Sequence, residues 1–233
     1  MSEHKSKKAN YISSKESARI SRFNRKLTKR LEKQRNRKKV NPDTYMTKMK
    51  DSGNVVEFDN VCSYFFTDIG TVKAVDGASF VVPKCSTVGI VGESGCGKSV
   101  TSLSLMQLLQ RPHGQTVGGE IRFNVGEGDS GDAIDIAKAP NEVVQHMRGN
   151  RMAMIFQEPM TSLNPVFTVG SQLIEAILLH TDKNKKEAWA RAVEMLTLVG
   201  VNEPESRMKQ YPHELSGGMR QRVMIAMALA CRP

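Results

Sequence analysis

One stretch of this chain carries a complete loop motif, Gly92-Glu93-Ser94-Gly95-Cys96-Gly97-Lys98-Ser99. It fits the pattern Gly-x-x-x-x-Gly-Lys-Ser/Thr at every required position. An apolar, β-branched run precedes it at residues 86–91, and apolar residues at helical spacing follow it over residues 100–109. This order of strand, glycine loop and helix predicts a loop whose backbone N–H groups surround a phosphate, while the positive end of the helix dipole faces the same anion.

Two side chains of the loop extend this prediction to ATP and Mg²⁺. Lys98 is expected to neutralise charge on the β- and γ-phosphates, and Ser99 supplies a hydroxyl of the kind that ligates Mg²⁺. The competing interpretation, a surface glycine turn that happens to carry a lysine, fits the flanking strand and helix patterns less well. The remaining residues expected to bind the nucleotide are Gly92, Glu93, Ser94, Gly95, Cys96, Gly97 and Val100.

Composition narrows the class of protein. With 39% hydrophobic and 25% charged residues among 233, the chain is typical of a soluble globular protein. No run of 18 or more apolar residues is present, and no apolar segment follows the charged amino terminus, so neither a membrane-spanning helix nor a secretory signal is expected. The cysteines form no CxxC pair and are expected to be reduced thiols rather than disulfides or metal ligands: Cys62, Cys85, Cys96 and Cys231.

Positive charge is concentrated at the amino terminus. Residues 1–50 hold 17 of the 34 Lys and Arg residues and four of the 24 acidic residues, so this segment carries +13 and the rest of the chain −3. The composition favours a disordered basic tail over residues 1–53. The alternative is a basic amphipathic helix that could contact anionic lipid or RNA, because apolar residues recur at helical spacing at Ile20, Phe23, Leu27 and Leu31.

From residue 54 onward the pattern is that of an α/β fold. Alternating and β-branched runs predict strands at residues 55–58, 72–75, 78–82, 120–123 and 151–156. Helical periodicity predicts helices at residues 169–180, 185–199 and 218–229. A β-rich amino-terminal subdomain is therefore expected to lead into the phosphate loop, with a helical insert over about residues 159–215.

A second glycine motif, Leu215-Ser216-Gly217-Gly218, stands immediately before the last of these helices. It is another anion-binding helix N-terminus, although a single phosphate chain needs only one cradle from its own subunit. With the upstream loop and the following Gln221, the chain resembles the ATP-binding subunits of ABC transporters. The resemblance implies that Ser216, Gly217 and Gly218 contact the γ-phosphate of ATP held by the facing subunit, whereas alone the motif reads as a serine N-cap.

The resemblance assigns roles to two further residues. Gln157 matches the family's Q-loop and is implied to act, with Lys98, in catalysis by binding Mg²⁺ or the attacking water. Phe65 matches the aromatic residue that stacks on adenine. Tyr64 and Phe66 are rivals, and alternation along the strand favours Phe65, with a core aromatic as the competing interpretation.

Residues 156–166 and 211–223 resemble the importer group for oligopeptides, dipeptides and nickel. This implies a P-loop NTPase core of the ABC ATPase type over residues 54–233, which couples ATP binding and hydrolysis to peptide import. The implied partners are two transmembrane permease subunits, a second ATPase subunit in a heterodimer and, indirectly, an extracytoplasmic peptide-binding protein. The implied location is the cytoplasmic face of the cell membrane, as a peripheral subunit, and no specific nucleic acid is expected.

The sequence departs from the family pattern at its carboxyl end. In relatives, the residues after the signature helix form the Walker B strand, the D-loop and the switch histidine, whereas this sequence reads Cys231-Arg232-Pro233. The ATPase domain is therefore expected to be incomplete at the C-terminus, and these 233 residues alone to bind nucleotide weakly and hydrolyse it little. The alternatives are a catalytically silent partner and a non-transport ABC protein that binds RNA or ribosomes through its basic tail.

Overall fold

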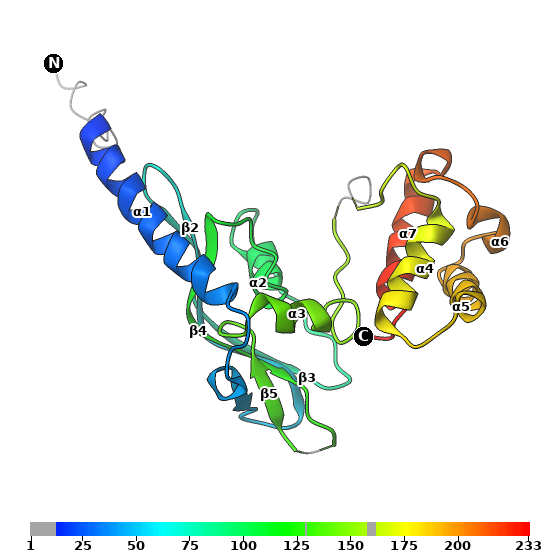
Figure 1. Cartoon of the computed structure of the whole chain (residues 1–233), viewed down its shortest axis with the longest axis horizontal. Helices are drawn as coiled ribbons and strands as arrows, with labels where there is room; N and C mark the ends of the chain where they lie inside the picture. Colours follow the sequence, from blue (N-terminus) through cyan, green and yellow to red (C-terminus); the bar gives the residue numbers. More distant parts are fainter. Residues whose placement is uncertain (1–12, 129, 158–161) are drawn as a thin grey trace. The chain divides into compact units, whose positions relative to one another are not determined.

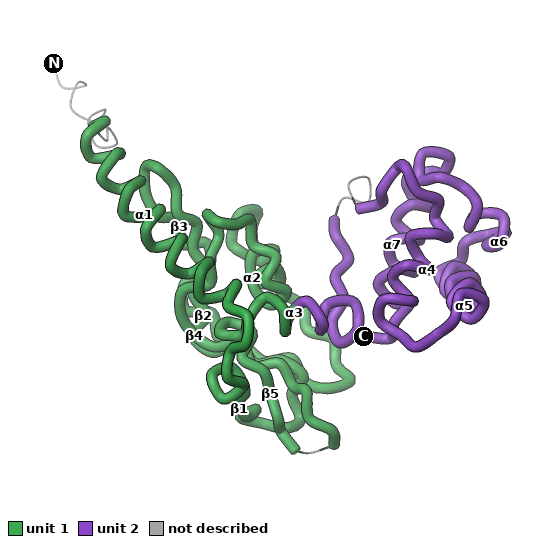
Figure 2. Tube along the Cα trace, viewed as in Figure 1, with its two compact units in different colours: residues 1–144 green, residues 145–233 purple. Residues whose placement is uncertain are grey.

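The computed structural model describes residues 13–128, 130–157 and 162–233. The chain divides into two compact units, residues 1–144 and residues 145–233 (Figure 2). In chain order the described elements are α1 (Ser14–Arg35), η1 (Pro42–Thr44), β1 (Met46–Lys48), β2 (Asn54–Phe66), β3 (Thr71–Pro83), α2 (Lys98–Leu105), β4 (Gly114–Asn124), β5 (Asp132–Asp135), α3 (Asn141–Met147), α4 (Val169–His180), α5 (Lys185–Leu198), α6 (Pro204–Arg207), η2 (Pro212–Glu214) and α7 (Gly217–Leu229).

Unit 1 is built on a five-stranded antiparallel sheet in the order β1-β5-β4-β2-β3. The long hairpin of β2 and β3 dominates it, and β4 pairs with the other edge of β2. The strands expected at residues 72–75 and 78–82 are one continuous strand, β3, because their backbones share the same partner. The strands expected at residues 55–58 and 120–123 lie within β2 and β4.

A buried carboxylate fastens the loop before β2 to the sheet. Glu57 accepts hydrogen bonds from the backbone N–H groups of Lys50 and Asp51, both at 2.9 Å, and from the Asn54 amide at 3.0 Å. Arg122 Nη1 lies 3.7 Å from the same carboxylate. Burial by itself raises the pKa of Glu57, but the hydrogen bonds and the Arg122 charge together bring this pKa below its ordinary value.

The described part of the basic tail contains the helix that was the alternative to the disordered segment favoured by composition. Residues 14–35 form α1, which Figure 1 shows alongside the sheet. Its Asn24 amide donates to the carbonyl oxygens of Thr67, at 2.8 Å, and Gly70, at 3.2 Å, in the turn between β2 and β3. Phe23, on the expected apolar stripe, is 66% exposed. The other three residues of that stripe, Ile20, Leu27 and Leu31, are half-buried, so the helix docks through these apolar side chains and through polar hydrogen bonds.

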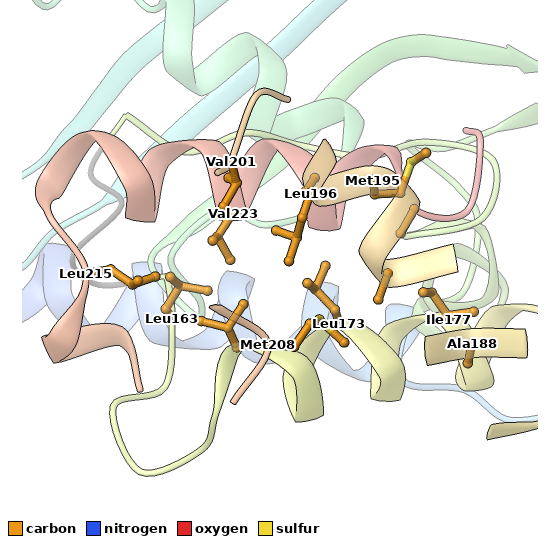
Figure 3. Packing of buried hydrophobic residues seen from close by; sticks show 14 residues of the cluster. Leu163, Leu173, Ile177, Ala188, Met195, Leu196, Val201, Met208, Leu215 and Val223 are labelled. Carbon is orange, nitrogen blue, oxygen red and sulfur yellow. The ribbon is translucent and has the colours of Figure 1, made fainter. Parts of the chain in front are cut away.

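Unit 2 is helical, and its core is shared by α4, α5 and α7. Leu173 and Ile177 from α4, Leu196 from α5 and Val223 from α7 are fully buried and converge in this core (Figure 3). Each such side chain contributes about 1.5–3 kcal/mol of transfer free energy. The bounds of α4, α5 and α7 confirm the three helices expected from periodicity. Among the described helices, none combines the length and apolar character needed to cross a bilayer.

The compact units do not coincide with the expected division at residue 54. β1 and the described part of the basic segment share unit 1 with the sheet, and the helical unit includes α7 as well as the segment expected as an insert. The first residues of that expected insert, 159–161, lie outside the described residues.

Two expected strands are wrong. Residues 86–91 form no strand, and Val91 is 95% exposed. Of residues 151–156, only Met152 makes a β contact, an isolated bridge to Arg148. A strand needs a neighbour for its alternating N–H and C=O groups, and within the described parts of the chain neither segment has a strand partner.

Candidate nucleotide-binding site

The phosphate loop connects β3 to α2 and closes on its own lysine. Lys98 Nζ donates to the carbonyl oxygens of Gly92, at 2.7 Å, and Glu93, at 2.6 Å, and lies 3.5 Å from Cys96 Sγ. The ammonium group therefore lies within the arc of the loop that precedes it. Of its three acceptors, the thiol sulfur is the weakest. An anionic phosphate oxygen that enters the loop would replace this contact with a stronger, charge-assisted one.

Glycine is required at several points of the loop. Gly97, the N-cap of α2, has φ +92°, and a Cβ at this position would lie 2.3 Å from the Ala74 carbonyl oxygen of β3. Gly95 has φ +81° in open space, and a Cβ at Gly92 would lie 2.6 Å from Cys96 Sγ. The loop thus takes left-handed turns and approaches the β3 backbone more closely than any other residue type allows.

Buried hydroxyl groups hold α2 on the sheet. Ser104 Oγ lies 2.7 Å from Ser63 Oγ of β2, which in turn lies 3.1 Å from Thr116 Oγ1 of β4. The sequence did not predict this network, although a serine among the apolar residues of α2 is a signal for it. Ser99, expected to ligate Mg²⁺, is exposed in the first turn of α2, and Val100 is half-buried beside it. The network fixes the helix whose N-terminus carries the loop.

The structure distinguishes the three aromatic rivals at the end of β2. The Tyr64 hydroxyl donates to Asp76 Oδ1 at 2.5 Å, and Phe66 is buried with 6% exposure. Phe65 is half-buried and packs against Gly114, where a Cβ would lie 2.8 Å from the Phe65 ring. Phe65 is therefore the one of the three side chains with a partly exposed ring and no polar group to satisfy.

The other expected site residues belong to unit 2. Gln157 is exposed in a bend after residues 153–156, and the four residues that follow it lie outside the described parts. Ser216 caps α7, with its Oγ accepting from the Met219 N–H at 3.4 Å. Gly217 and Gly218 are exposed, and no atom lies within 4 Å of a Cβ built on either. The structure therefore brings the phosphate loop together with β3 in unit 1, and the serine and glycines together at the start of α7 in unit 2.

A glycine loop that closes on its lysine, at the N-terminus of a helix packed on a sheet, defines the nucleotide-binding class of P-loop proteins. Within that class, the family model for ABC transporters matches residues 75–233. The chain belongs to the ABC transporter family of ATP-binding proteins, which confirms the resemblance seen in its motifs.

Similar curated proteins are named as ATP-binding proteins for oligopeptide transport, peptide transport and glutathione import. The chain is 49% identical over 179 residues to the oligopeptide transport ATP-binding protein AppD of Bacillus subtilis, covering 77% of this chain and 52% of AppD. It is 48% identical to the probable peptide ABC transporter ATP-binding protein y4tR of Sinorhizobium fredii, covering 73% and 49%. It is 47% identical to the glutathione import ATP-binding protein GsiA of Escherichia coli, covering 78% and 29%. The chain spans about half the length of these relatives, or less.

Solved structures confirm the α/β fold of an ABC ATPase. The ATP-binding cassette MJ0796, in a dimeric post-hydrolysis state with ADP and Pi, matches with a TM-score of 0.65 and 23% identity over 76% of this chain and 70% of that one. CbiO1 of Clostridium perfringens matches with a TM-score of 0.55 and 19% identity, covering 79% and 63%. At these identities the likeness shows the fold.

Proposed function

We propose that residues 92–99 of this chain bind ATP with Mg²⁺, and that the ATP-binding subunit to which the chain belongs couples ATP binding and hydrolysis to peptide import through a membrane permease. The observation that carries the proposal is the placement of Lys98 Nζ between two carbonyl oxygens of the loop, at the N-terminus of α2. The relatives named for oligopeptide, peptide and glutathione transport support peptides as the substrate class.

In this proposal the loop stabilises the negative charge of the ATP phosphates. Lys98 neutralises the β- and γ-phosphates, and the backbone N–H groups of the loop together with the α2 dipole stabilise the remaining negative charge. Phe65 stacks on the adenine ring, because an aromatic face of this kind accepts a base without a specific hydrogen bond. Ser63 and Ser104 keep α2, and with it the lysine, fixed to the sheet.

The residues proposed for Mg²⁺ suit that ion. Ser99 presents an exposed hydroxyl next to Lys98, and Gln157 presents an exposed amide. Hydroxyl and amide oxygens are the hard donors that Mg²⁺ accepts, and this ion takes few protein ligands because it keeps water and phosphate oxygens. When bound, Mg²⁺ neutralises phosphate charge, and Gln157 orients the attacking water.

The serine and glycines at the start of α7 are proposed to act on a nucleotide held by another subunit. Ser216, Gly217 and Gly218 present an exposed helix N-terminus with open space beside both glycines. Such a surface fits the γ-phosphate of an ATP molecule that is bound by a second, different ATPase subunit. In this proposal both ATPase subunits bind two transmembrane permease subunits at the cytoplasmic face, and a peptide-binding protein supplies the substrate from outside.

Nucleotide binding is tested with Lys98→Ala, measured by titration of a fluorescent ATP analogue with Mg²⁺. Losing a charge-assisted interaction worth about 1.5–3 kcal/mol is expected to weaken binding about 10- to 150-fold. Lys84→Ala is the matched control, because Lys84 lies in the same unit and donates to Gly128 rather than to the loop. Equal affinities of the two variants for the ATP analogue would contradict the proposal that residues 92–99 bind the phosphates.

The contribution of α7 is tested with Gly218→Glu, at a position where a side chain has room. The variant should bind nucleotide normally, because Lys98 is untouched, but lose ATP-driven association with the second ATPase subunit. Light scattering with ATP and with ADP measures the association.

Uptake of a labelled tripeptide by cells carrying Lys98→Ala tests the substrate class, since unchanged uptake would contradict peptide import.

A further inference from the structure

The outer face of α1 carries an array of cations whose side chains remain exposed. Six of these exposed residues are Arg19, Arg22, Lys26, Lys29, Arg30 and Lys33. At about 100° per residue they fall within an arc of about 100°, and they extend for about 21 Å along the helix. Within the described parts of the chain, none of the six lies in an ion pair.

The opposite face of α1 fixes the direction in which these cations point. Ser17 Oγ donates to the Asp68 carbonyl oxygen at 3.0 Å, and Ser21 Oγ to Asp68 Oδ1 at 2.6 Å. Further along, the buried Arg35 donates to the Thr116 carbonyl oxygen at 3.3 Å. These contacts come from one side of the helix and span most of its length. The basic arc is therefore held outward by the fold of unit 1.

The carboxylate nearest to the arc's carboxyl end is directed to the sheet. Glu32 accepts from Gln115 Nε2 at 2.7 Å and lies 3.8 Å from Arg111 Nε. It is thus engaged by partners other than the outward cations. At the border of the arc stands Phe23, 66% exposed, which adds an apolar ring to a basic surface. Basic helices with an aromatic residue at the edge of the charged face suit the boundary between lipid headgroups and acyl chains.

We propose that the outer face of α1 binds the anionic phospholipid headgroups of a bilayer surface. The proposal rests on the proposed function, which places the chain beside a membrane permease. A line of cations about 21 Å long on a fixed helix matches the negative surface potential of a membrane rich in anionic lipid, and Phe23 enters the headgroup region. The surface would hold unit 1 at the bilayer independently of nucleotide.

The test is co-sedimentation of the full chain with vesicles of phosphatidylcholine alone and with about 30% phosphatidylglycerol. Binding is expected only with the anionic lipid, and it should fall between about 0.1 M and about 1 M salt because the charges become screened. A triple variant, R22Q/K26Q/R30Q, removes three of the six cations named above. Each basic residue near an anionic surface raises affinity about fivefold, so the affinity of this variant for the vesicles should fall on the order of 100-fold.

The matched control is K183Q/K185Q/K186Q, which removes the same charge from exposed positions of unit 2. It should bind vesicles like the parent chain. Phe23→Ser should weaken binding by a factor that salt does not change, because it removes an apolar contact. Circular dichroism of each variant checks that α1 remains folded.

Several outcomes would overturn the proposal. These are equal binding to neutral and anionic vesicles, equal losses in the two triple variants, and binding that disappears on deletion of residues 1–12 but survives R22Q/K26Q/R30Q. Retention of a structured RNA in the presence of excess anionic vesicles would assign the surface to nucleic acid instead. Nucleotide affinity separates this proposal from the proposed function, because R22Q/K26Q/R30Q should leave it unchanged while Lys98→Ala should leave vesicle binding unchanged.

Discussion

Replacing Gly97 with alanine tests whether the close contact between the phosphate loop and β3 holds Lys98 in position. The φ of +92° places residue 97 in the left-handed region, which costs a residue with a Cβ about 1–2 kcal/mol. The new Cβ would also lie 2.3 Å from the Ala74 carbonyl oxygen, so backbone must move. Overpacking of this kind costs about 1–3 kcal/mol. Together these effects should destabilise unit 1 by about 2–5 kcal/mol.

Gly95→Ala is the matched control. Gly95 also has a left-handed φ, +81°, but no atom lies within 4 Å of a Cβ built there. It should therefore lose only about 1–2 kcal/mol, from backbone conformation. The difference between Gly97→Ala and Gly95→Ala therefore measures the cost of the close approach to β3 at Ala74 and Val75.

The assay is hydrogen exchange of backbone amides in β2, β3 and α2 during urea titration. Trp189, the chain's single tryptophan, packs against the core of unit 2, so its fluorescence follows that unit separately. Gly97→Ala should accelerate exchange in unit 1 more than Gly95→Ala does, and should weaken ATP binding because Lys98 follows residue 97. Equal exchange rates in the two variants would refute the reasoning that the loop is fixed by its approach to β3.

Three further predictions concern other parts of the chain. A carboxylate with a lowered folded pKa stabilises above its unfolded pKa and loses that contribution as the pH falls through the folded pKa. Glu57→Gln should therefore cost about 1–3 kcal/mol at neutral pH, with the gap from the parent chain closing in acid, as measured by urea unfolding. Asn24→Ala should raise amide exchange in α1 and leave the strands unchanged, because it removes the amide that holds the helix on the hairpin turn; faster exchange throughout the sheet would argue against this role. Iodoacetamide should label the exposed Cys96 before Cys231, since burial raises the pKa of the Cys231 thiol, and ATP should slow labelling of Cys96 alone.

The helices of unit 2 were predictable because their signals are local. Asn184 caps α5 together with Glu187 in a capping box, and Thr168 and Ser216 cap α4 and α7. A side chain that satisfies N–H groups two or three residues away acts within one turn, so sequence alone contains the interaction. The helix boundaries agree to within one residue for this reason.

The prediction of a strand at residues 86–91 was wrong because a strand depends on a partner segment elsewhere in the chain, not on local signals alone. Its β-branched residues have the right propensity, but propensity supplies no partner for the backbone. Val88 and Val91 are exposed, and the segment has no strand neighbour among the described residues. Strand formation is a property of two segments at once, and periodicity describes only one of them.

The face of α1 that docks was hidden by the same limitation. Hydrophobic periodicity singles out Ile20, Leu27 and Leu31, which are half-buried, but it also includes Phe23, which is exposed. It does not indicate Ser17 and Asn24, whose partners are carbonyl oxygens of a distant turn. A hydrogen bond to a backbone carbonyl has no counterpart in the sequence of the turn that provides it. Only the fold reveals which polar residues of a basic helix are structural and which remain outward.

The proposed ATP site depends on local sequence motifs and on contacts between segments that lie far apart in the sequence. Experiments can therefore test these two contributions separately. The motif determines that a lysine follows a glycine loop, but the contact of Gly97 with β3 and the bond between Ser63 and Ser104 determine where that lysine lies. The serine and glycines of α7 depend on another core, that of unit 2. Variants of the loop should therefore change nucleotide affinity, whereas Gly218→Glu should change only the association that ATP drives. A variant of α7 that weakened nucleotide binding by the isolated chain would show that the two units build one site in cis.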